Sequence, residues 1–446
     1  MSKSAKPGVY ARAKMFAARR TRSEWIALAA IALFIVLFFK PVVAGDGFGY
    51  YTVLEGAVRD HTLNLSQQYH YNNVTNGSTV FFYAPSGVYA TQYAPGLAIA
   101  SAPLYAVSLV LDDFRVFHVS DSFFIAERGD ILVHMASVAL TSLIFVAVAL
   151  LLGLELLGRL GLKRHAPLAL LAAFFGTPLI RYATYDLTYT HAIEAGILAI
   201  AVFIFFTDDK KSLLIGAVMG AMTLVRYTSI ALLVPFLAYY AWRKRWRDAA
   251  LAVAGAVPFV LGVMSYWWAQ FGSPFITSYT ASGSLTGNIS LIPWGIGNVL
   301  FSMQPDPQAL AWWTPICIIA LIGLALWENR RKWVLLGLFA VMLWVTGSSF
   351  HGTTGFSFSH RYFAALFIVF LIGTAVLLDK FVKAKWLVAA ATAWTVLLFV
   401  LHLTGEYSSF ATLQSVYAYW FNGGRLGELP SKLYGKLGVI RLLANK

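Results

Sequence analysis

The sequence predicts an all-α polytopic membrane protein, and two features of its composition lead to this prediction. Hydrophobic residue types make up 59% of the 446 residues and charged types only 12%, whereas a soluble domain carries about 25% charged residues. The apolar residues also fall into continuous stretches, many of them close to the ~20 residues that a helix needs to cross a bilayer. A bundle of about eleven transmembrane helices is the fold class that these observations favour.

Eleven apolar stretches are candidates for these helices. Taken in chain order, they cover residues 25–43, 130–153, 167–183, 190–206, 212–226, 228–242, 249–270, 311–327, 333–349, 362–379 and 386–403. The first stretch follows a basic segment, 1–24, and no small-residue cleavage pattern comes after it. We therefore interpret it as a retained first helix and not as a cleaved signal peptide.

A twelfth stretch, 94–111, is short and contains Pro95 and Pro103, so positive charge has to decide whether it crosses. If it does not cross, the segments predicted to be cytoplasmic hold 22 of the 34 Lys and Arg residues; they are 1–24, 154–166, 207–211, 243–248, 328–332 and 380–385. Cytoplasmic segments of membrane proteins are enriched in Lys and Arg. This rule favours eleven spans, a cytoplasmic N-terminus and an extracytoplasmic C-terminus, with 94–111 lying in the outer leaflet.

The same threading places most residues outside the spans on the outer face. The transmembrane domain covers 25–404, with long external loops at 45–129 and 271–310 and an external tail at 405–446. Because the net charge of +14 is concentrated in orientation signals, it does not predict a nucleic-acid partner. Helical spacing of apolar residues over 50–60 predicts a helix lying in the membrane interface.

Two acidic residues lie where the chain leaves the membrane on this outer face. Asp46 follows the first span among three glycines and stands close to Tyr50, so the backbone there can bring the carboxylate close to a ligand. The alternative is an acidic residue that only marks the membrane exit. Asp186 lies in a very short second loop, between Arg181 and His191. It is either a substrate-binding group in an interior cavity or the partner of Arg181 in a structural ion pair.

Two arginines lie on the side that otherwise lacks positive charge. Arg226 ends a short apolar run, and Arg361 follows His360 after a turn rich in glycine and hydroxyl groups. A guanidinium group binds phosphate through two parallel hydrogen bonds, so the two arginines together predict an anion site. Contact with lipid headgroups is the alternative for each residue alone.

The order of these features resembles that of the GT-C glycosyltransferases, which are integral membrane enzymes that use sugars linked to lipid phosphates. Asp46 matches the acidic position of that family's first loop, Asp186 the acidic position of its second loop, and 271–310 its substrate-gating loop. Many relatives have two adjacent carboxylates in the first loop, where this sequence has Asp46 followed by Gly47. Four stretches also resemble uncharacterised bacterial members of the protein-mannosyltransferase and aminoarabinose-transferase superfamily: Asp46–Tyr51, Tyr93–Pro103, Leu224–Thr228 and Gly355–Tyr362.

The resemblance implies transfer of a sugar from a polyprenyl-phosphate carrier to a glycan, lipid or protein acceptor, on the outer face of a bacterial inner membrane. A single base and direct displacement imply inversion at the sugar carbon. Asp46 is then the general base, and the residues expected to bind substrate are Asp186, Tyr50, His191, Arg226, His360 and Arg361. No cofactor is assigned, and a divalent cation, Mg²⁺ or Mn²⁺, stays open because metal dependence varies within the family.

Two other functions fit some of the same residues. A transporter or a flippase for lipid-linked sugars would also place Arg and Asp at membrane depth, but such folds often contain inverted repeats, and none is evident here. An enzyme like the O-antigen ligases or polymerases would use His351, His360 and Arg361 in a late, large loop. Here the longest loop is the first one.

The predicted threading can be tested with single cysteines in a variant from which Cys317 has been removed. We expect an impermeant thiol reagent added from outside to label cysteines at Asp112 and Gly423 but not at Lys163 or Arg245. Labelling at Lys163 together with protection at Asp112 would show that 94–111 crosses the membrane.

Overall fold

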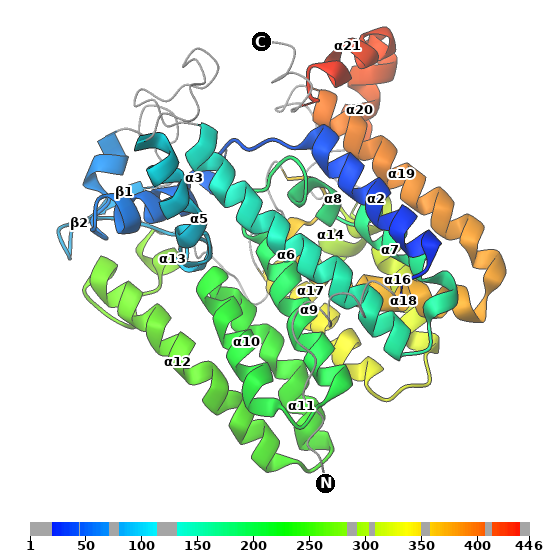
Figure 1. The fold of residues 1–446 in the computed structure, drawn as a ribbon, viewed down its shortest axis with the longest axis horizontal. Helices are drawn as coiled ribbons and strands as arrows, with labels where there is room; N and C mark the ends of the chain where they lie inside the picture. The colour runs from blue at the N-terminus through cyan, green and yellow to red at the C-terminus, as the bar shows by residue number, and fades with distance from the viewer. Residues whose placement is uncertain are drawn as a thin grey trace, which may run out of the picture.

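The computed structural model is a helical bundle with a few short elements at its ends (Figure 1). It describes residues 20–43, 45–70, 80–113, 132–282, 292–302, 308–348, 357–405 and 413–437. Within these ranges the only sheet is a hairpin of two antiparallel strands, β1 (Val80–Tyr83) and β2 (Val88–Thr91).

Each of the eleven predicted spans contains at least one helix among its described residues. The helices are α2 (Arg22–Phe38), α6 (Leu132–Arg159), α7 (Ala166–Phe175) with α8 (Leu179–Tyr182), α9 (His191–Thr207), α10 (Ser212–Val225), η4 (Tyr227–Leu233) with α11 (Val234–Trp242), α12 (Trp246–Phe271), α15 (Leu310–Trp313) with α16 (Ile316–Leu326), α17 (Lys332–Ser348), η7 (Arg361–Leu366) with α18 (Phe367–Lys380), and α19 (Lys385–Thr404). Two stretches that were predicted as continuous are interrupted, the third before Pro178 and the eighth at Pro315. Pro178 and Pro315 are the N-cap residues of α8 and α16, a position at which proline is tolerated because its missing amide hydrogen is not needed. Pro103 and Pro258 lie inside α5 and α12 without ending these helices.

Among the described residues, four helices are long and apolar enough to cross a bilayer: Val133–Arg159, Trp246–Phe271, Arg361–Lys380 and Val382–Thr404. Shorter apolar helices surround them. Together with the composition, these helices support a polytopic membrane protein. The number of eleven crossings stays a prediction.

The remaining elements lie between the long helices or, from α20 onward, follow α19. They are α3 (Asp46–Leu54), η1 (Glu55–Arg59), α5 (Gly96–Asp113), η3 (Lys163–His165), α13 (Ser278–Ala281), α14 (Ile292–Phe301), η8 (Val382–Ala384), α20 (Leu413–Tyr417), η10 (Ala418–Asn422), η11 (Arg425–Glu428) and α21 (Leu429–Tyr434). The helix predicted over 50–60 is present but begins earlier, at Asp46. Most of α3 is buried against the rest of the protein, including α5, so it belongs to the packed body of the molecule.

Helix α18 lies at the centre of the bundle. Its residues from Phe367 to Leu378 are all buried, and it packs against α6, α7, α9 and α16. A helix that is apolar on all sides is expected in such a position. Gly373 of α18 and Gly323 of α16 each lie directly on the backbone of the other helix. Small residues at such contacts let membrane helices approach closely.

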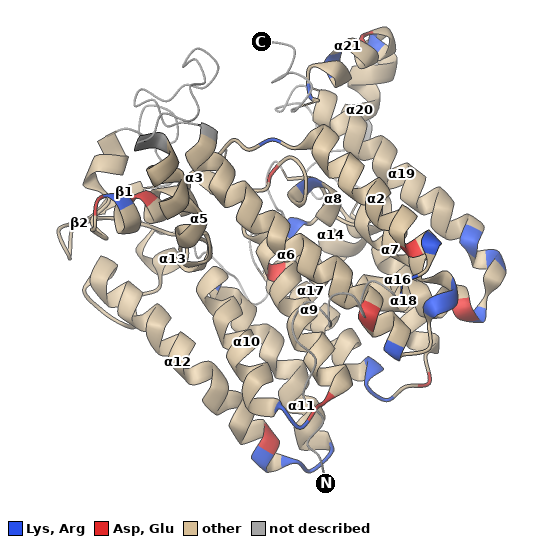
Figure 2. Cartoon of the chain, in the orientation of Figure 1, with Lys and Arg blue, Asp and Glu red and all other residues tan. Residues whose placement is uncertain are grey.

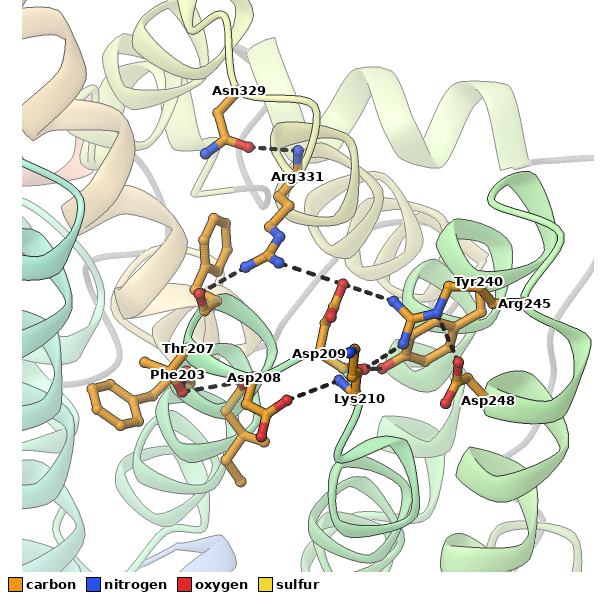
Figure 3. A network of polar contacts seen from close by, with 12 residues as sticks. Phe203, Thr207, Asp208, Asp209, Lys210, Tyr240, Arg245, Asp248, Asn329 and Arg331 are labelled. Atoms are coloured by element: carbon orange, nitrogen blue, oxygen red, sulfur yellow. Dashed lines mark hydrogen bonds and ion pairs between the residues drawn. The ribbon is translucent and has the colours of Figure 1, made fainter.

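Charged residues gather at the ends of the helices, and Figure 2 shows many of them below α11 and α12 and below α16 and α18. A polar network joins three of the connections that were predicted to be cytoplasmic (Figure 3). Asp209 lies 2.8 Å from Nη1 of Arg245 and 3.4 Å from Nη2 of Arg331. Arg245 also pairs with Asp248 at 2.7 Å. The loops after α9, α11 and α16 therefore meet at one end of the bundle, as the threading requires.

A contact at the opposite end of the bundle, between Asp46 and Tyr189, constrains whether α5 can cross the membrane. Asp46 precedes α5, whereas Tyr189 follows α5, α6, α7 and α8, yet the Asp46 amide donates a hydrogen bond to the Tyr189 hydroxyl at 3.3 Å. Two residues on the same side of a membrane must be separated by an even number of crossings. If α6 and the α7–α8 segment cross, this contact requires that α5 does not; whether 94–111 stays on the outer side stays a prediction.

Candidate active site

The first segment after α2 brings Asp46 against the short loop that precedes α9. Gly45 has φ +53°, a conformation that disfavours residues with a side chain. A side-chain carbon at Gly45 would overlap with the Tyr189 hydroxyl, and one at Gly47 would overlap with Thr188. The glycines on both sides of Asp46 therefore allow the first and second outward loops to touch.

Two further glycines bring the first and third outward loops together. A carbon added at Gly49 would overlap with the ring of Tyr93, so α3 lies directly against the residue that leads into α5. Gly96 at the start of α5 lies on the backbone around Val225, immediately before Arg226. Close backbone approach thus places the loops that carry Asp46, Tyr93 and Arg226 next to one another.

The Asp46 carboxylate has two side-chain partners. Its Oδ2 atom lies 2.6 Å from Nη1 of Arg361, and its Oδ1 atom accepts a hydrogen bond from the Tyr93 hydroxyl at 3.1 Å. Burial raises the pKa of Asp46, but Arg361 and the Tyr93 hydrogen bond more than offset this effect, so the pKa lies below its usual value. The carboxylate side chain keeps 32% of its surface exposed. It is therefore ionised at neutral pH and open to a ligand.

A second, fully buried charge group surrounds Glu194 in the first turn of α9. Its carboxylate lies 3.6 Å from Nε of Arg226 and 3.4 Å from Nδ1 of His191, and it accepts a hydrogen bond from Ser229 at 2.6 Å. The guanidinium group of Arg226 also donates to the Thr190 hydroxyl at 3.3 Å. Because burying an unpaired charge is costly, Glu194 fixes the position of Arg226.

Aromatic rings connect the two arginines. The guanidinium carbon of Arg226 lies 4.4 Å from the centre of the Tyr362 ring. That of Arg361 lies 5.6 Å from the same ring and 5.9 Å from the Tyr189 ring. Cation–π contacts of this kind hold a guanidinium group in place without neutralising its charge.

Tyr50 and Tyr279 complete the group. The Tyr50 hydroxyl lies 3.4 Å from that of Thr190, and its ring packs edge-on against Tyr93, with the centres 4.7 Å apart. Tyr279 of α13 lies edge-on to the ring of Tyr227, the residue after Arg226, with the ring centres 6.1 Å apart, and burial raises the pKa of Tyr279. The 271–310 loop, predicted to gate substrate, therefore contributes a phenol to this site.

The structure thus brings together five of the predicted site residues: Asp46, Tyr50, His191, Arg226 and Arg361. Four of them come from three of the stretches in which the sequence resembles bacterial GT-C proteins, and His191 is the first residue of α9. The fourth stretch, Tyr93–Pro103, contributes Tyr93, which contacts Asp46. Glu194, Tyr93, Tyr189, Tyr279 and Tyr362 were not predicted. Glu194 had a usable signal, an ionisable residue inside an apolar run, whereas nothing in the sequence distinguishes these tyrosines from packing residues.

Asp186 and His360 make other contacts. Asp186 accepts a hydrogen bond from Nε of Arg181 at 2.5 Å, and Arg181 also lies 2.7 Å from Nδ1 of His402. Of the two interpretations of Asp186, the structural pair with Arg181 is the one that these contacts match. His360 is buried, with its ring 6.4 Å from that of Phe363. A substrate contact of either residue stays a prediction, and His351 lies outside the described residues.

No metal can be assigned from the described part of the chain. There, no group of three or more His, Cys, Asp or Glu side chains is placed to hold an ion. Binding of a divalent cation, Mg²⁺ or Mn²⁺, therefore stays untested.

Comparison with known proteins identifies the fold. No protein-family profile matches the sequence, and no curated protein sequence matches it either. The structure superposes on the crystal structure of ArnT from Cupriavidus metallidurans in the apo state with a TM-score of 0.52, over 93% of this chain and 73% of the ArnT chain. The fold is that of ArnT. Because only 14% of the residues are identical, the likeness to ArnT confirms the resemblance to the GT-C enzymes at the level of the fold.

The buried charge group can be tested through Glu194→Gln, which keeps the size of the side chain but removes its charge. Breaking a buried ion pair typically costs about 3–5 kcal/mol, because one charge is left without compensation. We expect the thermal unfolding midpoint in detergent to fall clearly. Glu328→Gln is the matched control, since Glu328 pairs with Lys380 while 92% exposed, and such pairs contribute about 1 kcal/mol or less. Equal midpoints for the two variants would contradict this role of Glu194.

Proposed function

We propose that this chain is a membrane glycosyltransferase that moves a sugar from a polyprenyl phosphate to an acceptor hydroxyl group on the outer face. The ArnT fold supports a GT-C type of enzyme. The observation that carries the proposal is the Asp46–Arg361 pair, a partly exposed carboxylate held by a guanidinium group among tyrosine rings. A base and a phosphate-binding group are the two functions that this reaction needs.

The donor phosphate binds Arg361 and Arg226 in this proposal. Arg361 is the cation that can exchange partners, because its carboxylate partner is 32% exposed, whereas the partner of Arg226 is fully buried. As a phosphate oxygen approaches Arg361, it competes with Asp46 for the guanidinium group. Donor binding therefore releases the Asp46 carboxylate from its strongest partner at the moment when a base is required.

Asp46 then accepts the proton of the acceptor hydroxyl group. The acceptor oxygen forms a bond to the anomeric carbon as the bond from that carbon to the phosphate oxygen breaks, which inverts the configuration. The departing polyprenyl phosphate gains negative charge, which Arg226 and Arg361 stabilise. A phosphate leaves without a strong general acid, so a second carboxylate at the reaction centre is not needed.

The role of Asp46 is tested by Asp46→Asn in purified protein supplied with a lipid-linked sugar and an acceptor. The amide keeps the size of the side chain but accepts no proton at neutral pH, and loss of a general base typically costs 10²–10⁴-fold in rate. Turnover is measured as polyprenyl phosphate released together with glycosylated product. We expect it to fall by about 10²-fold or more, while the donor still binds.

Asp209→Asn is the matched control, because Asp209 also pairs with arginine but lies in the polar network at the other end. We expect it to keep full activity. Full activity of Asp46→Asn would contradict the mechanism, and loss of turnover only in Asp186→Asn would transfer the role of base to Asp186. Movement of labelled donor across the membrane without any acceptor would instead indicate a flippase.

The exchange of partners on Arg361 predicts a difference between two pH profiles. In the free enzyme Arg361 keeps the pKa of Asp46 below its usual value. The value of kcat/KM should therefore fall only below about pH 4, where Asp46 becomes protonated. In the donor complex phosphate occupies Arg361, and the pKa of Asp46 rises. We expect the acidic limb of kcat to lie at least about 1 pH unit higher than that of kcat/KM. Coinciding limbs would show that the Asp46–Arg361 pair persists during turnover.

A further inference from the structure

A second group of cations lies around Tyr185, on the same short loop that carries Tyr189. Lys40, which follows the last turn of α2, donates a hydrogen bond from Nζ to the Tyr185 hydroxyl at 3.1 Å. The same Nζ atom lies 4.2 Å from the ring centre. Lys436 and Arg181 also face this ring, at 5.9 Å and 5.8 Å. We call Lys40, Arg181, Tyr185 and Lys436 the Tyr185 cluster.

The positive charge of this cluster is not balanced by the described residues around it. Arg181 pairs with Asp186, but neither Lys40 nor Lys436 has a carboxylate within 4.0 Å in the described part of the chain. Burial raises the pKa of the Tyr185 phenol, yet Lys40 and Lys436 more than offset this effect, so the pKa lies below its usual value. Lys40, Tyr185 and Lys436 are all half-buried, so solvent or a lipid can reach them.

The cluster is held in place by its surroundings. The Lys40 amide donates to the carbonyl of Thr184 at 3.3 Å, which ties the end of α2 to the Tyr185 loop. Lys436 follows α21, and Leu433 and Leu437 on either side of it pack on an apolar core that includes Phe38 of α2. The two lysines thus come from opposite ends of the chain to a common, fixed position.

The tail that carries Lys436 has the composition of a membrane-interface segment. Four large side chains remain exposed on it: Tyr417 (55%), Phe421 (47%), Leu426 (44%) and Tyr434 (55%). Exposed apolar side chains next to lysines and arginines are typical of helices that lie in the headgroup region. In the predicted threading, α2 leaves the membrane at its outer surface, where lipid phosphates lie.

We propose that the Tyr185 cluster is a binding site for a phosphate group, supplied by an anionic lipid headgroup of the outer leaflet. Lys40 and Lys436 contact the phosphate oxygens, and the Tyr185 hydroxyl donates a hydrogen bond to one of them. The cluster shares no residue with the Asp46 site, and the proposal does not depend on sugar transfer.

The test uses the full-length protein in a neutral detergent. Dioctanoyl phosphatidylglycerol, dioctanoyl phosphatidylcholine and inorganic phosphate are titrated separately, and thermal stabilisation gives each affinity, because a ligand that binds the folded state raises its stability. A lysine near an anionic lipid surface contributes about 1 kcal/mol. We therefore expect the double variant K40Q/K436Q to bind phosphatidylglycerol about thirtyfold more weakly than the wild type.

The control variant K383Q/K385Q removes the same charge from exposed lysines at the start of α19, and we expect it to bind as the wild type does. K436Q alone removes no side-chain hydrogen bond in the described part of the chain, so an intermediate loss in this variant would support the site without a change in folding. Stabilisation by inorganic phosphate that K40Q/K436Q abolishes would support the site and assign it to soluble phosphate. Wild-type affinity in K40Q/K436Q, or an equal loss in the control, would overturn the proposal.

Discussion

The ion pair between Asp46 and Arg361 sets the arrangement of one whole end of the protein. It joins the first outward segment to the first residue of η7, and it can form only if the intervening helices return the chain to the same side. Apolar helices alone do not specify which ends meet, because any two apolar faces can pack. A charge near the membrane has few suitable partners, so such pairs select one arrangement from many. The network around Asp209 does the same at the opposite end, where it joins the loops after α9, α11 and α16.

The two ends differ in how their arginines are paired with carboxylates. At the Asp209 end, carboxylates, guanidinium groups and main-chain carbonyls satisfy one another, and Arg331 donates to the carbonyl of Phe206 at 2.7 Å. Arginines contact aromatic rings at both ends, since Arg245 and Arg331 lie over Tyr240 and Phe205 just as Arg226 and Arg361 lie over tyrosines. The carboxylates differ: Arg245 lies within 2.8 Å of both Asp209 and Asp248, whereas in the described part of the chain Arg361 pairs with Asp46 alone, whose side chain is 32% exposed. Under the proposed function, this difference separates an arginine that can take a further anion from a network that fastens loops together.

The sequence was sufficient for the helices and for part of the site. Long apolar runs predict helices because a bilayer requires them, but the breaks before Pro178 and at Pro315, the end of α2 at Phe38 and the start of α3 at Asp46 were missed. Asp46, Arg226 and Arg361 could be predicted because each is an ionisable residue on a side with few cations. Tyr93, Tyr189 and Tyr362 could not, since a tyrosine in an apolar sequence has the same local pattern whether it fills the core or faces a guanidinium group. Their role depends on contacts between segments far apart in the chain, and no local periodicity records such contacts.

The short loop before α9 belongs to both cation sites. Tyr189 lies against Asp46 and Arg361, Tyr185 lies against Lys40 and Lys436, and the Tyr189 amide donates to the carbonyl of Asp186 between them at 3.2 Å. The loop has few residues and buried backbone on both sides, so it cannot rearrange around one tyrosine and leave the other in place. A change of its backbone must therefore alter both sites at once. Only side chains that reach one site from outside the loop, such as Lys436 for the Tyr185 cluster and Arg361 for the Asp46 site, can be used to test the two proposed sites separately.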